Sequence, residues 1–258
     1  VLEGALADVV QLAVGADFSC ARKRDGAVLC WGRGDSGQLA DETKRQSQNP
    51  VAIPLGDVAI DVAAGGAHAC AVLATGRVAC WGSNRRGQGG NPAAAVETQS
   101  KPFVLPGVEG AVEVGAGTNH ACVRLQGGTV SCWGAGEAGQ LGPNERTGGA
   151  TPVPIAELTG VLDLSVAGNH VCVRVEGGAV RCWGQGSGGQ VGTGVLLDRN
   201  PRPADVRDLP GPATAIATGT NVSCAIVAGA VHCWGQNRSG EVGDGTRELR
   251  TTATKVLG

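Results

Sequence analysis

The chain has 258 residues, with 44 Gly, 12 Pro and 10 Cys, and its 21 basic side chains nearly balance 23 acidic ones. A hydrophobic share of 42 % excludes a flexible Gly-rich linker, and the missing basic excess argues against a nucleic-acid partner. Because no uncharged apolar run reaches the roughly 18 residues of a membrane helix, we expect a globular, turn-rich protein without a membrane span.

Five copies of one motif follow one another along the chain. In each copy a Trp stands between Cys and Gly, and after four further residues comes Gly-Gln or Gly-Glu; these are Trp31, Trp81, Trp133, Trp183 and Trp234. Recurrence at intervals of about 51 residues marks a tandem repeat. We therefore expect a single domain, residues 1–258, built from five repeats.

Short segments that are rich in β-branched residues and bounded by Gly predict strands. In chain order they are residues 112–114, 151–155, 161–166, 166–175, 178–183, 222–227 and 230–234. The last two flank the tight turn Ala228-Gly229, which indicates a hairpin. Four short strands per repeat are typical of β-propeller blades, so the predicted fold is all-β: a five-bladed β-propeller of four-stranded antiparallel blades.

The two ends of the chain resemble complementary parts of one repeat. The stretch from Thr254 to Gly258 is similar to residues 103–107, and residues 1–10 are similar to the residues that come after that stretch in the other repeats. We expect a composite blade, with its first strand from the C-terminus and the others from the N-terminus, because such a blade closes a ring and removes sheet edges. A closed ring is expected to be a monomer. The alternative is a fragment of a larger ring, which would expose blade faces and self-associate.

The ten cysteines occur in pairs, nine or ten residues apart, placed symmetrically about predicted turns: Cys20 and Cys30, Cys70 and Cys80, Cys122 and Cys132, Cys172 and Cys182, and Cys224 and Cys233. Facing residues of an antiparallel ladder are close enough for a disulfide. Zinc sites use closer Cys or His spacings, and free buried thiols are a second alternative. The register favours five disulfides, hence an oxidising, extracytoplasmic compartment, either secreted or in the cell envelope.

The pattern Cys-Trp-Gly-x-Gly-x-x-Gly-Gln-Leu/Val resembles the repeat of the regulator of chromosome condensation family. An upstream Gly-x-x-His-x-Cys, present at residues 65–70 and 117–122 and one residue shorter at 168–172, belongs to the same resemblance. It covers the whole chain and implies a propeller with four-stranded blades, although well-known members have seven. The founding member is a nuclear exchange factor for a small GTPase and binds chromatin.

That nuclear function is not expected here, because the chain shows no basic tail and its paired cysteines do not suit a nucleus. The chain looks more like bacterial extracytoplasmic repeats of the family. Among these, a secreted β-lactamase inhibitor shows that the scaffold can serve purely for protein binding.

The residues between Trp-Gly and the following Gly-Gln or Gly-Glu differ from repeat to repeat, while the flanking motif residues stay the same. Repeat proteins present binding surfaces in this way, so the candidate ligand-binding residues are Asp35, Arg85, Arg86, Glu137 and Arg238. The alternative is a loop that is simply exposed. The Trp residues are expected in the core or between blades, each with a partner for its N–H.

The recurring His68, His120 and His170 are replaced by Phe18 and Val222 in the other repeats, which argues for structural histidines hydrogen-bonded to adjacent loop backbone. Asp61, Glu113 and Asp163 also recur at related positions, which favours a structural role over a glycosidase-type pair.

No nucleophile–base pair or metal-ligand cluster is visible, so we expect no catalytic residue, no metal and no other cofactor. The predicted function is a non-enzymatic binding module for a protein or cell-surface ligand. Two alternatives stay open: a hydrolase or lyase with a site in the central channel, and a passive structural or adhesive module of a larger extracellular protein.

Overall fold

The computed structural model describes residues 6–93, 95–145 and 147–258. The strands are β1 (Val9–Val14), β2 (Phe18–Lys23), β3 (Val28–Gly32), β4 (Ser47–Ala52), β5 (Ala59–Ala64), β6 (His68–Leu73), β7 (Val78–Ser83), β8 (Thr98–Val104), β9 (Ala111–Ala116), β10 (His120–Leu125), β11 (Val130–Gly134), β12 (Gly149–Pro154), β13 (Val161–Ala167), β14 (His170–Val175), β15 (Val180–Gly184), β16 (Asn200–Asp205), β17 (Ala213–Thr218), β18 (Val222–Val227), β19 (Ala230–Gly235) and β20 (Arg250–Lys255). A single 3-10 turn, η1 (Glu176–Gly178), interrupts them. Within the described ranges no helix is long and apolar enough to cross a membrane.

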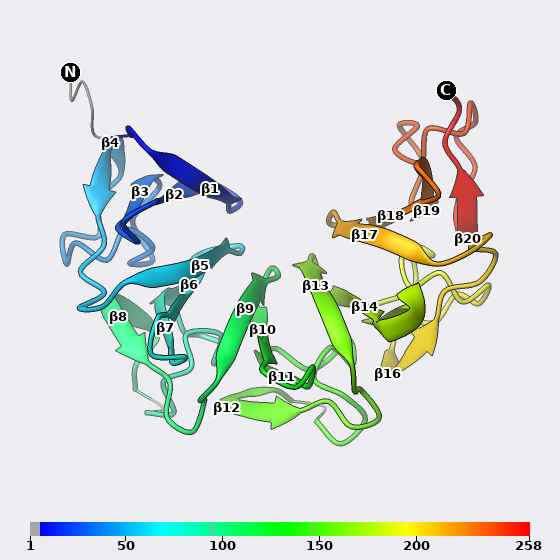
Figure 1. Ribbon diagram of the computed structural model, residues 1–258. Coiled ribbons are helices and arrows are strands. Elements are labelled where there is room, and N and C mark those ends of the chain that lie inside the picture. The colour runs from blue at the N-terminus through cyan, green and yellow to red at the C-terminus, as the bar shows by residue number, and fades with distance from the viewer. Residues whose placement is uncertain (1–5, 94, 146) are drawn as a thin grey trace. The chain divides into compact units, whose positions relative to one another are not determined.

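Every four consecutive strands form one sheet in which neighbours in sequence are neighbours in space (Figure 1). We call these sheets blades 1 to 5, from β1–β4 to β17–β20. The predicted all-β fold of five four-stranded antiparallel blades is therefore confirmed. The chain divides into two compact units, of which unit 1 holds blades 1 and 2 and most of blade 3, and unit 2 holds the remainder.

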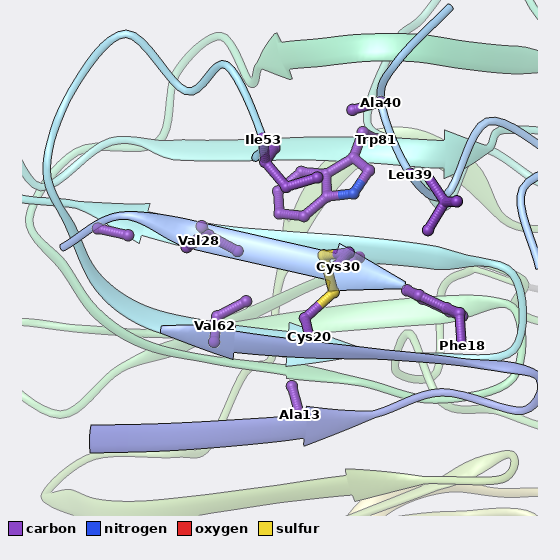
Figure 2. Close-up of a cluster of buried hydrophobic side chains, with 13 residues drawn as sticks. Ala13, Phe18, Cys20, Val28, Cys30, Leu39, Ala40, Ile53, Val62 and Trp81 are labelled. Carbon is purple, nitrogen blue, oxygen red and sulfur yellow. A yellow bond between two sulfur atoms is a disulfide. The ribbon is translucent and has the colours of Figure 1, made fainter. Parts of the chain in front are cut away.

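The two middle strands of blade 2 are buried on both faces, because blade 2 packs between blades 1 and 3. All residues of β6 and β7 are buried. Figure 2 shows one such seam in unit 1, where Trp81 and Val62 of blade 2 lie beside Val28 and the Cys20–Cys30 disulfide of blade 1. Burial of side chains of this size stabilises a fold by about 1.5–3 kcal/mol each. The seams between blades therefore hold much of the core.

The five predicted cysteine pairs are disulfides, each joining the second and third strands of one blade. The partners face each other in the ladder, as Cys70 and Cys80 do between β6 and β7. In blade 5 the sequence separation is nine instead of ten. The shorter spacing matches the two-residue turn Ala228-Gly229, because Val227 pairs directly with Ala230.

The predicted composite blade is wrong. The last strand, β20, pairs with β19 through Cys233 and Thr254, and blade 1 takes all four of its strands from residues 9–52. The similarity between Thr254 and Phe103 is confirmed, since each is the last but one residue of a fourth strand and pairs with the second Cys of its own blade. That strand completes its own blade and does not begin the next one. Residues 1–5 of the N-terminal stretch lie outside the described residues.

One predicted strand was also too long. Residues 166–175 span the end of β13 and all of β14, with Gly168 and Asn169 forming the turn between them. Gly168 has a φ of +52°, a conformation that favours glycine and ends a strand. The predicted Pro-containing strand at 151–155 corresponds to β12.

Exposure predicts the order in which the disulfides are reduced. Cys224 is half-buried, whereas the cysteines of the other four pairs are at most 1 % exposed. Since a reductant must reach a sulfur atom, Cys224–Cys233 is expected to open first in the native protein under limiting dithiothreitol. Alkylation followed by peptide mass spectrometry measures this, and unreduced protein should take up no label. First labelling at any other pair would contradict the expectation.

Candidate functional site

The candidate site consists of five loops that follow the third strand of each blade, here called the Gly-Gln loops: residues 33–38, 83–88, 135–140, 185–190 and 236–241. In four of them the Gln is buried with an exposure of at most 1 %. In three of these four loops the carboxamide oxygen accepts a hydrogen bond from the backbone N–H two positions earlier, at 2.8 Å from Ser36 to Gln38, at 2.8 Å from Arg86 to Gln88 and at 2.9 Å from Gly188 to Gln190. The Gln side chain therefore fixes the shape of its own loop.

Blade 5 carries Glu241 in place of this Gln. Its carboxylate accepts a hydrogen bond from the Ser239 N–H at 2.8 Å. Backbone N–H donors at Glu241 and Ser239 lower the pKa of the Glu241 carboxyl group. The Glu241 carboxylate therefore stabilises the same turn as the Gln side chains do, but it carries a negative charge.

The loop backbone is also tied to the next blade. The carbonyl oxygen of the loop Gln accepts the indole N–H of the following Trp; the pairs are Trp81 to Gln38 at 3.0 Å, Trp133 to Gln88 at 3.0 Å, Trp183 to Gln140 at 2.9 Å and Trp234 to Gln190 at 2.9 Å. All four indoles are fully buried. The predicted placement between blades, with a partner for each N–H, is confirmed for these four.

Inside this frame, one position is exposed in every blade. The third residue after Trp-Gly is exposed in all five loops, as Asp35, Arg85, Glu137, Ser187 and Arg238, and Arg86 is exposed beside Arg85. Asp35, Arg85 and Arg86 project from unit 1, whereas Glu137 and Arg238 project from unit 2. The structure places each candidate on the surface. Their binding role stays a prediction.

Asp35 and Arg85 have partners on their own blade. Arg33 contacts Asp35 at 2.7 Å and Asp17 at 3.1 Å, and its guanidinium holds the pKa of Asp35 below the usual range. Arg85 contacts Glu97 at 3.6 Å. All these side chains are more than half exposed, so solvent screens these pairs and they contribute little to stability.

Unit 2 contains a polar pocket of about 480 Å³ between the Gly-Gln loops of blades 4 and 5. Its lining includes both Arg238 and Arg247, and is otherwise uncharged: Gln185, Ser187, Gly188, Asn221, Gln236, Asn237 and Leu249. The sequence pointed to Arg238 alone. Arg247 was missed because it lies in the long connection to β20, outside the repeated motif.

A second pocket, of about 610 Å³, lies on blade 1 alone. Trp31, Gly32, Arg33, Gly34 and Asp35 line one side, and Asp17, Gln46, Ser47 and Gln48 complete it. Trp31 is half-buried here, unlike its four counterparts. Arg33 is the only basic residue in its lining and pairs with both Asp17 and Asp35, so the charges in this pocket are largely compensated, whereas the two arginines of the unit 2 pocket face no acidic lining residue.

The recurring histidines are fully buried. Burial lowers the pKa of His68 and of His170 to about 4, so both are neutral at pH 7. The expected bond to adjacent loop backbone is not what His170 makes: its Nε2 lies 2.8 Å from the hydroxyl of Ser223 on blade 5. That hydroxyl donates to the Gln190 carbonyl at 2.9 Å. His170 thus supports a Gly-Gln loop through Ser223.

The recurring carboxylates lie on the first strands of blades 2, 3 and 4 and are held by neighbouring donors. Asp61 accepts hydrogen bonds from the Gln11 side chain and, at 2.7 Å, from the Val114 N–H, and burial raises the pKa of its carboxyl group. Glu113 lies 2.6 Å from Arg124. Within the described ranges no three His, Cys, Asp or Glu side chains are grouped as metal ligands.

Comparison with known proteins places this geometry in a family. The model of the RCC1-like domain matches residues 2–257. The human E3 ubiquitin-protein ligase HERC2 is 33 % identical over 241 residues, which make up 90 % of this chain and 5 % of that protein. The mouse protein matches to the same extent.

Solved structures show the same fold. Prp20p from Saccharomyces cerevisiae is 20 % identical with a TM-score of 0.83, over 97 % of this chain and 63 % of that chain. The ectodomain of the receptor kinase CR4 from Physcomitrella patens is 19 % identical with a TM-score of 0.54, over 90 % of this chain and 52 % of that chain. The chain spans less than two thirds of each of these relatives. The family model covers nearly all of the chain and confirms the resemblance seen in its five repeats, so the chain belongs to the family of RCC1-like domains.

Proposed function

We propose that residues 1–258 form one propeller domain that acts as a non-enzymatic binding module and presents its Gly-Gln loops to a protein or cell-surface ligand. The observation that carries this proposal is that the backbone of the Gly-Gln loops is held by the same hydrogen bonds in several blades, while one exposed side chain of the loop differs from blade to blade. The bonds made by the loop Gln and by the following Trp hold the backbone, while the exposed position changes from Asp35 to Arg85, Glu137, Ser187 and Arg238.

The pocket of unit 2 indicates the chemistry of the partner. Arg238 and Arg247 line it without an acidic residue, and side-chain amides surround them. Guanidinium groups bind carboxylates through paired N–H donors. An acidic protein segment therefore fits this pocket better than a basic or an apolar one.

Protein binding also agrees with what is known of a relative. Prp20p was studied for its binding to Gsp1p and histones. At 20 % identity this likeness concerns the fold, so Prp20p supports a protein ligand in general and neither of its own partners in particular.

The disulfides support an extracytoplasmic location, secreted or in the cell envelope, because cytosolic thiols are kept reduced. The CR4 relative is itself an ectodomain. Bacterial origin stays a prediction from the sequence. The composite blade is not formed, and the monomer expected for a closed ring stays a prediction.

The binding module is favoured over a hydrolase or lyase because Asp61 and Glu113 are engaged in structural contacts. A passive structural module would have the same loop backbone, but under that hypothesis no partner's binding depends on the loop side chains.

The test compares two double variants with a control. Partners captured on the wild-type chain are identified, and their affinities are measured by calorimetry for Arg85→Ala with Arg86→Ala and for Arg238→Ala with Arg247→Ala. We expect at least about tenfold weaker binding from one of them without a change in melting temperature, since exposed charges contribute little to stability. The control is Arg202→Ala, which removes an exposed cation from β16. Equal affinities for both double variants, the control and the wild type would overturn the proposal.

A further inference from the structure

The pocket between the Gly-Gln loops of blades 4 and 5 presents more hydrogen-bond donors than acceptors. The carboxamide oxygens of its lining already accept hydrogen bonds, Gln185 from Asn169 at 3.2 Å and Asn221 from Gln190 at 3.4 Å. The oxygen of Gln236 accepts from Asn221 at 3.0 Å. The groups that remain for a ligand are therefore mainly N–H donors, which favours a partner that brings oxygen acceptors.

The acidic side chains of the blade 5 loop are paired with another cation. Asp244 and Glu248 both form ion pairs with Arg250. Neither Arg238 nor Arg247 forms an ion pair with a residue that the structure describes. Both guanidinium groups are therefore available to carboxylates, which they bind through paired N–H donors.

The exposure of Arg238 is a property of its loop. The pocket lies inside unit 2, between two blades that are consecutive in the chain. Arg238 occupies the position that Ser187 has in blade 4. Ser187 stays exposed although blade 5 covers that face of blade 4. This position of the loop therefore lies outside the seam between blades.

Aliphatic side chains border the same pocket. Leu249 is 40 % exposed and belongs to its lining. Val195, Leu196 and Leu197 are 49–51 % exposed and follow one another in the connection between β15 and β16; we call these three residues the aliphatic loop. The carbonyl oxygen of Leu197 accepts the N–H of Gly186 at 3.0 Å, and Gly186 stands between two lining residues of the pocket. The aliphatic loop thus begins at the edge of the pocket.

The aliphatic loop is held at the surface and is particular to blade 4. Just before it, the Gly194 N–H donates to the Thr251 carbonyl of β20 at 2.9 Å. The carbonyl that corresponds to the one of Leu197 belongs to Glu97 in blade 2 and to Glu248 in blade 5. Single exposed aliphatic residues are ordinary on a protein surface, whereas three in succession with a fourth beside them mark a contact area.

We propose that this part of unit 2 binds an amphipathic acidic segment of a partner protein. Carboxylates of the segment bind Arg238 and Arg247, and aliphatic or aromatic side chains a few residues away cover Leu249 and the aliphatic loop. The inference rests on the proposed function, which supplies the protein ligand, and adds the apolar half of the contact. A lipid surface fits less well, because the exposed Asp198 follows Leu197 and would face anionic headgroups.

The two halves of the contact respond differently to salt. Pairs between guanidinium groups and carboxylates at the surface weaken as the ionic strength rises, whereas the burial of apolar surface involves no charge that salt can screen. Loss of the two arginines should therefore remove most of the salt dependence of binding. Loss of the two leucines should lower the affinity by a similar factor at every salt concentration.

The test selects peptides from a phage-displayed random library on the oxidised wild-type chain. Affinities of the enriched peptides are then measured by fluorescence polarisation at low and at high NaCl concentration. We expect the enriched sequences to combine acidic residues with aliphatic or aromatic ones. Two double variants, Arg238→Gln with Arg247→Gln and Leu197→Ser with Leu249→Ser, should each weaken binding by at least about tenfold. Only the arginine variant should lose the salt dependence.

The matched controls change an exposed cation and an exposed leucine elsewhere in unit 2. They are Arg202→Gln on β16 and Leu162→Ser on β13, and both should bind the peptides as the wild type does. Circular dichroism melting verifies that all variants fold.

Three outcomes would overturn the inference. The first is that no peptide is enriched, and the second is that the leucine variant binds the enriched peptides as tightly as the wild type does. The third is that the wild type binds vesicles of phosphatidylcholine and phosphatidylserine through the two leucines while no peptide is enriched. None of these removes the proposed function, which fails only if the captured proteins bind equally well to both of its double variants, its control and the wild type.

Discussion

Trp133→Ala is expected to lower the free energy of unfolding by about 3–5 kcal/mol, the range found when a large buried aromatic side chain is truncated. Trp133 is fully buried in the seam between blades 2 and 3, in one cluster with Cys70 and Cys80. Truncation leaves a cavity there and removes the 3.0 Å hydrogen bond to the Gln88 carbonyl, which then lacks its donor. Urea denaturation of the oxidised protein, followed by circular dichroism, measures the loss.

The chain contains its own control. Trp31 occupies the same position in blade 1 but is half-buried. Trp31→Ala should therefore lower the free energy of unfolding by less than half as much as Trp133→Ala. A comparable loss from both substitutions would show that burial in the seam is not the source of the stability.

Acid is expected to destabilise the protein between about pH 6.5 and pH 4. Burial holds the pKa of His68 and of His170 at about 4 in the folded state, whereas an unfolded histidine has a pKa of about 6.5. In this window the unfolded chain binds more protons, so stability falls as the pH falls. Each histidine accounts for up to roughly 3 kcal/mol at pH 4. Denaturation midpoints measured from pH 7 to pH 4 record the slope.

Residues that other blades carry at the histidine position can be used to measure how much the histidines contribute to the loss of stability in acid. Blade 1 has Phe18 and blade 5 has Val222 at the histidine position. The variant His68→Phe with His170→Val should therefore fold, and its stability should fall less steeply with acid. Asp61, whose pKa is raised by burial, acts in the opposite direction but is common to both proteins. An unchanged slope in the double variant would rule out the histidines as its cause.

Local sequence was sufficient to predict the blade. The symmetric spacing of Cys70 and Cys80 about a turn fixes which residues face each other, and Ala228-Gly229 specifies a two-residue hairpin. The exchange of His for Phe and Val at one position favoured structural histidines, and His68, His120 and His170 are fully buried. These inferences succeeded because each depends on contacts within about fifty residues, where a repeat shows the same solution several times.

Contacts between blades were harder to predict. Nothing in the motif indicates directly that the Gln38 carbonyl accepts the indole N–H of Trp81, because both groups belong to every repeat and the motif does not tell which copies meet. The composite blade failed for a related reason: a repeat pattern has no intrinsic first strand. Arg247 escaped notice because its segment varies between repeats, so the pocket it shares with Arg238 became visible only in three dimensions.

The placement of the disulfides has a consequence for biosynthesis. Each bond joins cysteines nine or ten residues apart in one hairpin, so the correct partner of every first cysteine is the next cysteine to emerge as the chain is synthesised. Hairpins form within about 1–10 μs, far faster than thiols are oxidised. Native pairing can therefore proceed one repeat at a time behind the advancing chain, with little need for an isomerase to correct pairs between distant repeats.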